Sequence, residues 1–153
     1  DLVPTLENER RSSGIGPSLE YDSRDTIFTP SSGWQGSLDA LFYDPAFGGD
    51  ATFQTYRGHV FAYMPLAKVG VLGTRLDGRM ARGDTPFYML PYISLRGIPA
   101  LRYQGENTAL VESELRWDVN RRWSLMGFVG AGRAWDDSFS EEETRVAGGT
   151  GFR

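Results

Sequence analysis

Polar and apolar residues alternate along much of this chain, in blocks of roughly ten residues that turn-forming sequences separate. A period of two residues is typical of a β-strand whose two faces meet different surroundings. The chain also has 19 glycines and 13% aromatic residues, and long helix-forming runs are almost absent. We therefore expect an all-β, antiparallel protein. The expected strands are residues 15–24, 34–43, 53–64, 69–82, 108–117, 123–135 and 146–153.

The charged residues of two expected strands fall on one side of the alternation. That side of residues 69–82 and 108–117 carries Arg75, Asp77, Arg79, Glu112 and Glu114. The opposite side carries Leu72, Leu76, Met80, Ala109, Val111, Leu115 and Trp117. A soluble β-sandwich shows the same alternation when its charged face meets water. The alternation therefore leaves a soluble sandwich and a membrane barrel open.

Strand length and the spacing of the connections favour a membrane barrel. A tilted strand needs about 9–11 residues to cross a bilayer, whereas most soluble strands have about five or six. Short connections at residues 65–68 and 118–122 alternate with long ones at 83–106 and 136–145, as in outer-membrane barrels. Aromatic residues near the strand ends suit the two interfacial girdles of such a barrel. They are Trp34, Tyr43, Tyr63, Trp117, Trp123 and Trp135.

The charged residues indicate which face of such a barrel would meet lipid. An Arg on the lipid face at mid-depth costs about 2–4 kcal/mol, so Arg75 and Arg79 together would cost about 4–8 kcal/mol there. We therefore expect both side chains to face the lumen. Asp77, Glu112 and Glu114 are the available counter-ions.

Composition excludes several other classes of protein. The net charge of −4 argues against a nucleic-acid-binding protein, and a chain without cysteine has no disulfide or thiolate metal site. There is no run of roughly 18 apolar residues that would predict a transmembrane helix, and residues 1–11 lack the apolar core of a signal peptide. The 153 residues fit one domain or a piece of a larger one. We divide them into a leading segment, 1–13, and barrel strands, 14–153.

Patterns typical of catalysis or metal binding are weak. The single histidine, His59, lies in an expected strand, and no Gly-x-Ser-x-Gly sequence accompanies it. The acidic residues between 136 and 143 do not have the spacing of an EF-hand. Gly148-Gly-Thr-Gly151 is followed by neither a Lys nor a helix-forming run. We therefore expect no enzymatic activity, no metal and no cofactor.

The connection at residues 83–106 is too apolar for a loop in water. Two prolines in its central part, residues 90–105, disfavour a helix or a central strand. Arg96 lies in the middle of this part, among Tyr92, Ile93, Leu95, Ile98, Leu101 and Tyr103. An arginine that is buried with these side chains needs an acidic partner. Gly97 would allow the backbone to approach a neighbour closely.

Four short motifs occur in the order and strand spacing of one family. They are Tyr21-Asp-Ser-Arg-Asp25 with Pro30-Ser-Ser-Gly-Trp34, Leu95-Arg-Gly-Ile98, Glu112-Ser-Glu-Leu-Arg-Trp117, and Phe128-Val-Gly-Ala-Gly-Arg-Ala-Trp135. From about residue 14 to its end, the chain resembles the bacterial surface-antigen superfamily of outer-membrane β-barrels, which includes BamA, TamA and FhaC. The resemblance implies a sixteen-stranded barrel in the bacterial outer membrane, and the strands here look like its eighth to fourteenth. Because unpaired strand edges are costly in lipid, we expect a fragment of a longer chain or a piece that closes by association.

The resemblance also implies a role in outer-membrane protein insertion or polypeptide translocation. The implied partners are outer-membrane lipid, polypeptide substrates and accessory periplasmic proteins. In this superfamily the long loop folds back into the barrel, and the Arg of an Arg-Gly-aromatic motif pairs with lumenal acids. Leu95, Arg96, Gly97 and Ile98 are similar to that motif. The alternatives are a simple pore, a membrane anchor for an attached domain, and a soluble β-sandwich acting as a binding module.

The chain departs from the superfamily pattern at two positions. Ile98 stands where the family usually has Phe or Tyr, and Gly130 stands where it has a lumenal Asp. We therefore expect Arg96 to pair with Glu112 or Glu114. Asp77 is a less suitable partner.

Overall fold

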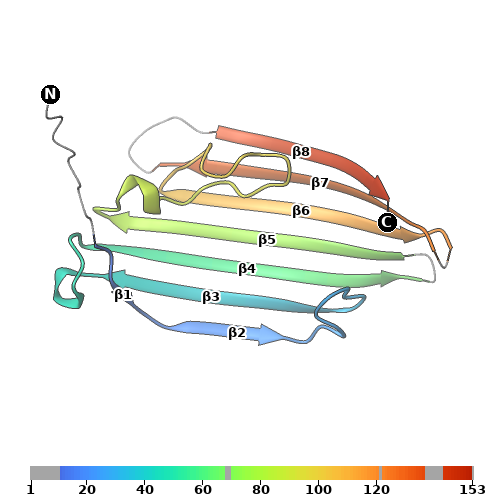
Figure 1. Ribbon diagram of the computed structural model, residues 1–153, viewed down its shortest axis with the longest axis horizontal. Coiled ribbons are helices and arrows are strands. Elements are labelled where there is room, and N and C mark those ends of the chain that lie inside the picture. The colour runs from blue at the N-terminus through green and yellow to red at the C-terminus, as the bar shows by residue number, and fades with distance from the viewer. Residues whose placement is uncertain (1–10, 68–69, 121, 137–142, 153) are drawn as a thin grey trace, which may run out of the picture.

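The described part of the chain forms one antiparallel β-sheet in which consecutive strands lie side by side from β3 onward (Figure 1). This computed structural model describes residues 11–67, 70–120, 122–136 and 143–152. The strands are β1 (Gly14–Ile15), β2 (Ser18–Asp22), β3 (Gly33–Tyr43), β4 (Phe53–Leu66), β5 (Gly70–Gly83), β6 (Asn107–Asp118), β7 (Ser124–Trp135) and β8 (Glu143–Phe152). Their order is β1-β3-β4-β5-β6-β7-β8, and β2 also pairs with β3. The predicted all-β antiparallel meander is confirmed, and over the described residues the sheet is open, with no pairing between its first and last strands.

The first predicted strand, residues 15–24, is interrupted in the structure. Its two pieces keep one register on β3, since Ile15 pairs with Phe42 and Ser18 pairs with Asp39. Pro17 lies between them and has no N–H to donate to the ladder. The sequence prediction therefore missed a break of two residues, while the described ends of the other strands lie within three residues of their predicted limits.

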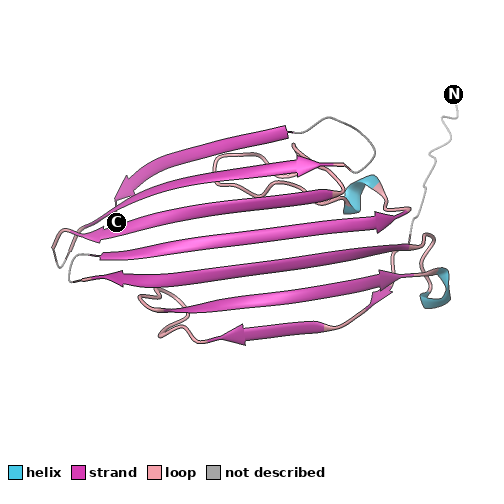
Figure 2. Cartoon of the chain, turned by 180° about the vertical axis from the view of Figure 1, so that it is seen from behind, coloured by secondary structure: helices cyan, strands magenta, loops and turns pink. Residues whose placement is uncertain are grey.

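Helical structure in the described residues is limited to two 3-10 turns. They are η1 (Pro45–Phe47), between β3 and β4, and η2 (Phe87–Met89), between β5 and β6. Figure 2 shows both at the same end of the sheet, which we call the loop end. No helix in this part of the chain is long and apolar enough to cross a membrane, a finding that bears only on helices.

The strand register separates charged and apolar residues onto opposite faces. On one face, Arg75 of β5 pairs with Glu112 of β6, which pairs in turn with Gly130 of β7. On the other face, Leu76 of β5 pairs with Val111 of β6. Because side chains alternate along a strand, these pairings define a polar face and an apolar face for the sheet.

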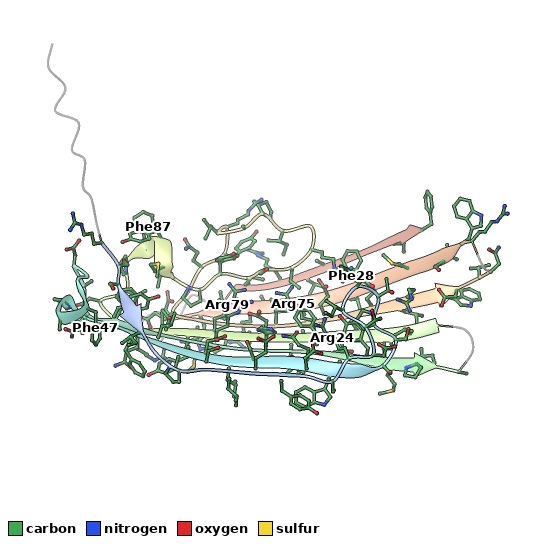
Figure 3. All side chains as sticks on the ribbon, turned by 60° about the horizontal axis from the view of Figure 1, so that its bottom comes forward. Arg24, Phe28, Phe47, Arg75, Arg79 and Phe87 are labelled. Carbon is green, nitrogen blue, oxygen red and sulfur yellow. The ribbon has the colours of Figure 1, made fainter. Side chains whose placement is uncertain are left out.

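The long loop, residues 84–106, covers part of the polar face. Figure 3 shows this loop on the side of the sheet where Arg75 and Arg79 lie. A buried apolar cluster forms beneath it. The cluster consists of Ile93, Leu95, Leu110 and Ala134, and Ile98, Tyr103 and Ala147 pack against it. This core therefore lies between the loop and the strands β6 to β8.

Candidate functional site

The long loop folds back on itself over the polar face. The N–H of Ile93 donates to the carbonyl of Tyr103 at 3.0 Å, and the N–H of Gly105 donates to the carbonyl of Pro91 at 3.1 Å. These two bonds hold the arms of the loop side by side. The segment that contains Arg96 therefore forms the tip of the loop, between its two arms.

Gly97 lies in the turn at this tip. The N–H of Ile98 donates to the carbonyl of Leu95 at 3.2 Å and closes the turn. The expected reason for glycine here was wrong, because a Cβ at Gly97 would meet no atom within 4 Å. Gly97 instead has a φ of 81°, in the left-handed region that glycine adopts without steric cost.

Arg96 pairs with two acidic side chains of β6. Its Nε lies 2.8 Å from Oε1 of Glu112, and its Nη1 forms a further ion pair with Oε2 of Glu114. The side chain of Glu112 is 3% exposed, whereas that of Arg96 is 44% exposed. The buried carboxylate is therefore neutralised by a cation that also reaches the space above the sheet.

The surroundings of Arg96 favour its charged form. Burial alone would lower the pKa of Arg96, but its hydrogen bond to Glu114 and the charges of Glu114 and Glu112 raise the pKa above its ordinary value. The guanidinium carbon also lies 4.7 Å from the ring centre of Phe128 on β7, a favourable cation–π distance. The tip of the loop is thus bound to two strands.

Two glycines of β7 form a trough for the apolar part of the loop. A Cβ at Gly130 would lie 2.8 Å from Cδ2 of Leu95, and a Cβ at Gly132 would lie 2.7 Å from Cγ2 of Ile93. Both distances are too short for real atoms. The missing side chain at residue 130 therefore leaves space that Leu95 occupies, where an Asp would collide with the loop.

Asp77 belongs to a second ionic cluster on β4 and β5. Its carboxylate lies 2.8 Å from Arg79, 3.3 Å from Arg57 and 3.5 Å from Arg75. Arg75 also donates to the carbonyl of Ser94 in the long loop at 3.1 Å. Arg79 also contacts the loop, because its guanidinium carbon lies 5.0 Å from the ring centre of Tyr92. Asp77 is therefore a partner of three strand arginines, two of which, Arg75 and Arg79, contact the loop.

Other residues singled out in the sequence have structural partners. Nδ1 of His59 lies 3.0 Å from Oγ of Ser37 and Nε2 lies 3.4 Å from Gln35 on the neighbouring strand. Asp136 accepts the N–H of Glu106 at 2.5 Å. Of the acidic residues between 136 and 143, those at 137–142 lie outside the described residues.

The sequence analysis missed several residues of this site. Leu95 was identified as part of the motif but not as the side chain that fills the trough, and Arg57, Ser94 and Phe128 were not assigned as contacts. The sequence did contain a pattern that could have predicted the trough: Gly130 and Gly132 are two residues apart in one expected strand. Such spacing leaves one face of a strand without side chains, next to a loop that needs burial.

Comparison of the sequence with models of known protein families identifies one family that matches the chain. The sequence model of the Omp85 superfamily domain matches residues 5–152. No curated protein matches the chain. The chain therefore belongs to the Omp85 superfamily, whose domain is characteristic of bacterial outer-membrane proteins. This result confirms the resemblance to surface-antigen barrels.

Proposed function

We propose that this chain is part of a non-enzymatic outer-membrane barrel that inserts or translocates polypeptides. In this proposal Arg96 anchors the long loop inside the lumen. The observation that carries the proposal is the ion pair of Arg96 with Glu112 and Glu114, on the polar face of an Omp85 domain. Lipids and polypeptide substrates are partners of Omp85 proteins in general.

The two faces of the sheet support this orientation. The polar face carries the buried carboxylates of Asp77 and Glu112 with their arginines, an arrangement that a water-filled lumen tolerates. The opposite face presents exposed apolar side chains such as Leu38, Leu76 and Val129. Hydrocarbon is the medium in which such a surface has no cost, whereas charge on a lipid face costs about 2–4 kcal/mol for each Arg at mid-depth.

An anchored loop has a physical consequence for transport. The hydrogen bonds between its arms, the trough on β7 and the Arg96 ion pairs hold the loop in one position. When the long loop is held in this position, it narrows the lumen. It also presents a fixed surface to a polypeptide that passes through. No covalent chemistry is required, because the protein acts by binding and by the shape of its interior.

The experiment compares Arg96→Ala with Arg102→Ala in the full-length protein. Arg102 is an exposed arginine of the same loop, whose guanidinium contacts the ring of Tyr103 at 5.6 Å. Arg96→Ala should impair assembly or secretion of polypeptides and make the long loop sensitive to protease, and Arg102→Ala should do neither. Unchanged assembly together with a larger single-channel conductance in Arg96→Ala would instead identify a simple pore.

A further inference from the structure

A hollow lies between the sheet and the first arm of the long loop. Its volume is about 420 Å³, within the range of roughly 300–1,000 Å³ that is typical of ligand sites. Figure 3 shows η2, which Phe87 marks, on the same side of the sheet as Arg79, so the hollow lies on the polar face. Residues 88–92 of the loop form its roof. Its floor includes Asp39, Leu41, Thr55, Arg57 and Arg79.

The roof of this hollow is held in place by two contacts. The side-chain amide of Gln104 donates to the carbonyl of Phe87 at 3.0 Å, from one arm of the loop to the other. The ring centre of Tyr92 lies 5.0 Å from the guanidinium carbon of Arg79 on β5. The hollow is therefore part of the folded arrangement of loop and sheet.

The floor of the hollow has more positive than negative charge. The guanidinium groups of Arg57, Arg75 and Arg79 share the buried carboxylate of Asp77. Asp39 also lines the hollow, and its carboxylate accepts hydrogen bonds from two serine hydroxyls at 2.5 and 3.0 Å. Three cations and two acids leave this cluster with a net charge of +1.

Arg57 is the cation of this cluster that is best able to bind a ligand. Its side chain is 47% exposed, whereas those of Arg75 and Arg79 are 20% and 16% exposed. Among the described residues it has one ion pair, from Nη2 to Oδ2 of Asp77 at 3.3 Å. Because a guanidinium has five N–H donors, donors of Arg57 remain for an anion. Asp77 would keep its closer partner, Arg79, at 2.8 Å.

We propose that this hollow binds the carboxylate of an acidic side chain on a polypeptide that passes through the lumen. Arg57 donates charge-assisted hydrogen bonds to the carboxylate. Met89 and Leu90 of the roof contact an apolar residue next to the acid. The inference rests on the proposed function and specifies its substrate class, which is a polypeptide with an acidic residue beside an apolar one.

Two features of the hollow favour this ligand. The surplus of positive charge favours an anion, and the planar fork of a guanidinium matches the two oxygens of a carboxylate. The apolar side chains of Met89 and Leu90 favour a ligand that also carries apolar groups. A free inorganic anion would leave these side chains without a partner.

The test measures the binding of two fluorescent peptides to the purified full-length protein in detergent by fluorescence anisotropy. The peptides are Gly-Ser-Leu-Glu-Leu-Ser-Gly and the same sequence with Gln in place of Glu, so they differ in one charge. Arg57→Gln removes the cation. Arg116→Gln is the matched control, because Arg116 is an arginine of the polar face near the opposite end of the sheet, where it pairs with Asp118.

The wild type and Arg116→Gln should bind the Glu peptide about tenfold more tightly than the Gln peptide, the factor expected for a hydrogen bond to a charged group. Arg57→Gln should bind the two peptides equally. If Arg57→Gln does not fold, Asp39→Asn tests the same surplus of charge, and it should strengthen the preference for the Glu peptide. Equal binding of the two peptides by the wild type overturns the inference. A preference that persists in Arg57→Gln, or one that does not increase in Asp39→Asn, also overturns it.

Free glutarate distinguishes a polypeptide ligand from a small carboxylate. It should not displace the Glu peptide at the concentration at which the peptide half-saturates the protein, and displacement there would overturn the polypeptide assignment. Loss of assembly in Arg96→Ala, together with equal binding of both peptides by the wild type, would overturn this inference alone. Unchanged assembly in Arg96→Ala, together with preferential binding of the Glu peptide, would contradict the proposed function and support the carboxylate site.

Discussion

Nε of Arg96 lies 2.8 Å from Oε1 of Glu112, and this contact joins the tip of a long loop to the middle of β6. The same guanidinium pairs with Glu114, two residues further along the strand. The contact matters because it is the ionic part of a larger attachment. The apolar part is the insertion of Leu95 and Ile93 against the glycines of β7.

The two carboxylates that bind Arg96 should contribute unequally. Glu112 is 3% exposed and Glu114 is 28% exposed, so solvent screens the second pair more. Glu112→Gln should lower the free energy of opening the loop by about 1–3 kcal/mol, and Glu114→Gln by less than about 1 kcal/mol. The rate of proteolysis of the loop under native conditions measures both. A larger effect at Glu114 would contradict this ranking.

Restoring the family's acidic residue at position 130 should damage the loop attachment. Gly130→Asp places a Cβ about where Leu95 already lies, 2.8 Å from its Cδ2, so the loop should become protease-sensitive. Gly130→Ala should show part of the same effect, while Gly127→Ala on the same strand should show none. The double variant Gly130→Asp/Leu95→Ala should recover protection, since it removes the clash and adds an acid near Arg96. Failure of this rescue would mean that steric exclusion is not the reason for glycine.

Among the charged residues of the polar face, Asp77 should cost the most folding stability when it is substituted. Asp77→Asn leaves Arg57, Arg75 and Arg79 without their shared carboxylate, which is 2% exposed. Removing one partner of a buried ionic group costs about 3–5 kcal/mol. Urea unfolding in detergent measures this loss.

Asp118→Asn is the control for Asp77→Asn. Asp118 is 47% exposed and lies 3.8 Å from Nε of Arg116, so its removal should cost less than about 1 kcal/mol. Similar costs for the two variants would show that the Asp77 cluster is hydrated and contributes little.

The turn between β2 and β3 should loosen in acid. The N–H groups of Ser31, Ser32 and Thr26 hydrogen-bond to Asp25 and hold its pKa below the ordinary value of 3.8. A carboxyl with a lowered pKa stabilises the folded turn above pH 3.8, and this contribution is lost as the pH falls through the folded-state pKa. Hydrogen exchange of the Ser31 and Ser32 amides should therefore become less protected at low pH. Asp25→Asn should remove that pH dependence, and an unchanged dependence would exclude Asp25 as its cause.

Much of the fold follows from local patterns in the sequence. Apolar and polar residues such as Leu76 and Asp77 alternate with the two-residue period of a strand. This period alone was enough to predict the positions of β3 to β8 closely. The motif around Arg96 and the absence of an acid at Gly130 limited its partners to Glu112 and Glu114. The break at Pro17 was missed because alternation continues across it, and only its missing N–H interrupts the ladder.

The remainder of the site depends on register and packing. Arg57 meets Asp77 because β4 and β5 pair Arg57 with Arg79, and no local pattern determines that alignment. The trough that holds Leu95 exists because Gly130 and Gly132 have no side chains. A glycine adds neither a polar nor an apolar side chain to the alternation pattern, so the pattern could not reveal the trough.

Adjacent residues of β4 give the most direct test of the two-sided sheet. The chain contains no cysteine, so single spin labels can be placed within it at His59→Cys and Val60→Cys, and at Leu76→Cys on β5. In lipid vesicles, labels at residues 60 and 76 should collide mainly with dissolved oxygen, which concentrates in hydrocarbon. The label at residue 59 should collide mainly with a water-soluble nickel chelate. If the chelate reaches residues 60 and 76 as readily as residue 59, the apolar face meets water and the barrel assignment of its faces is wrong.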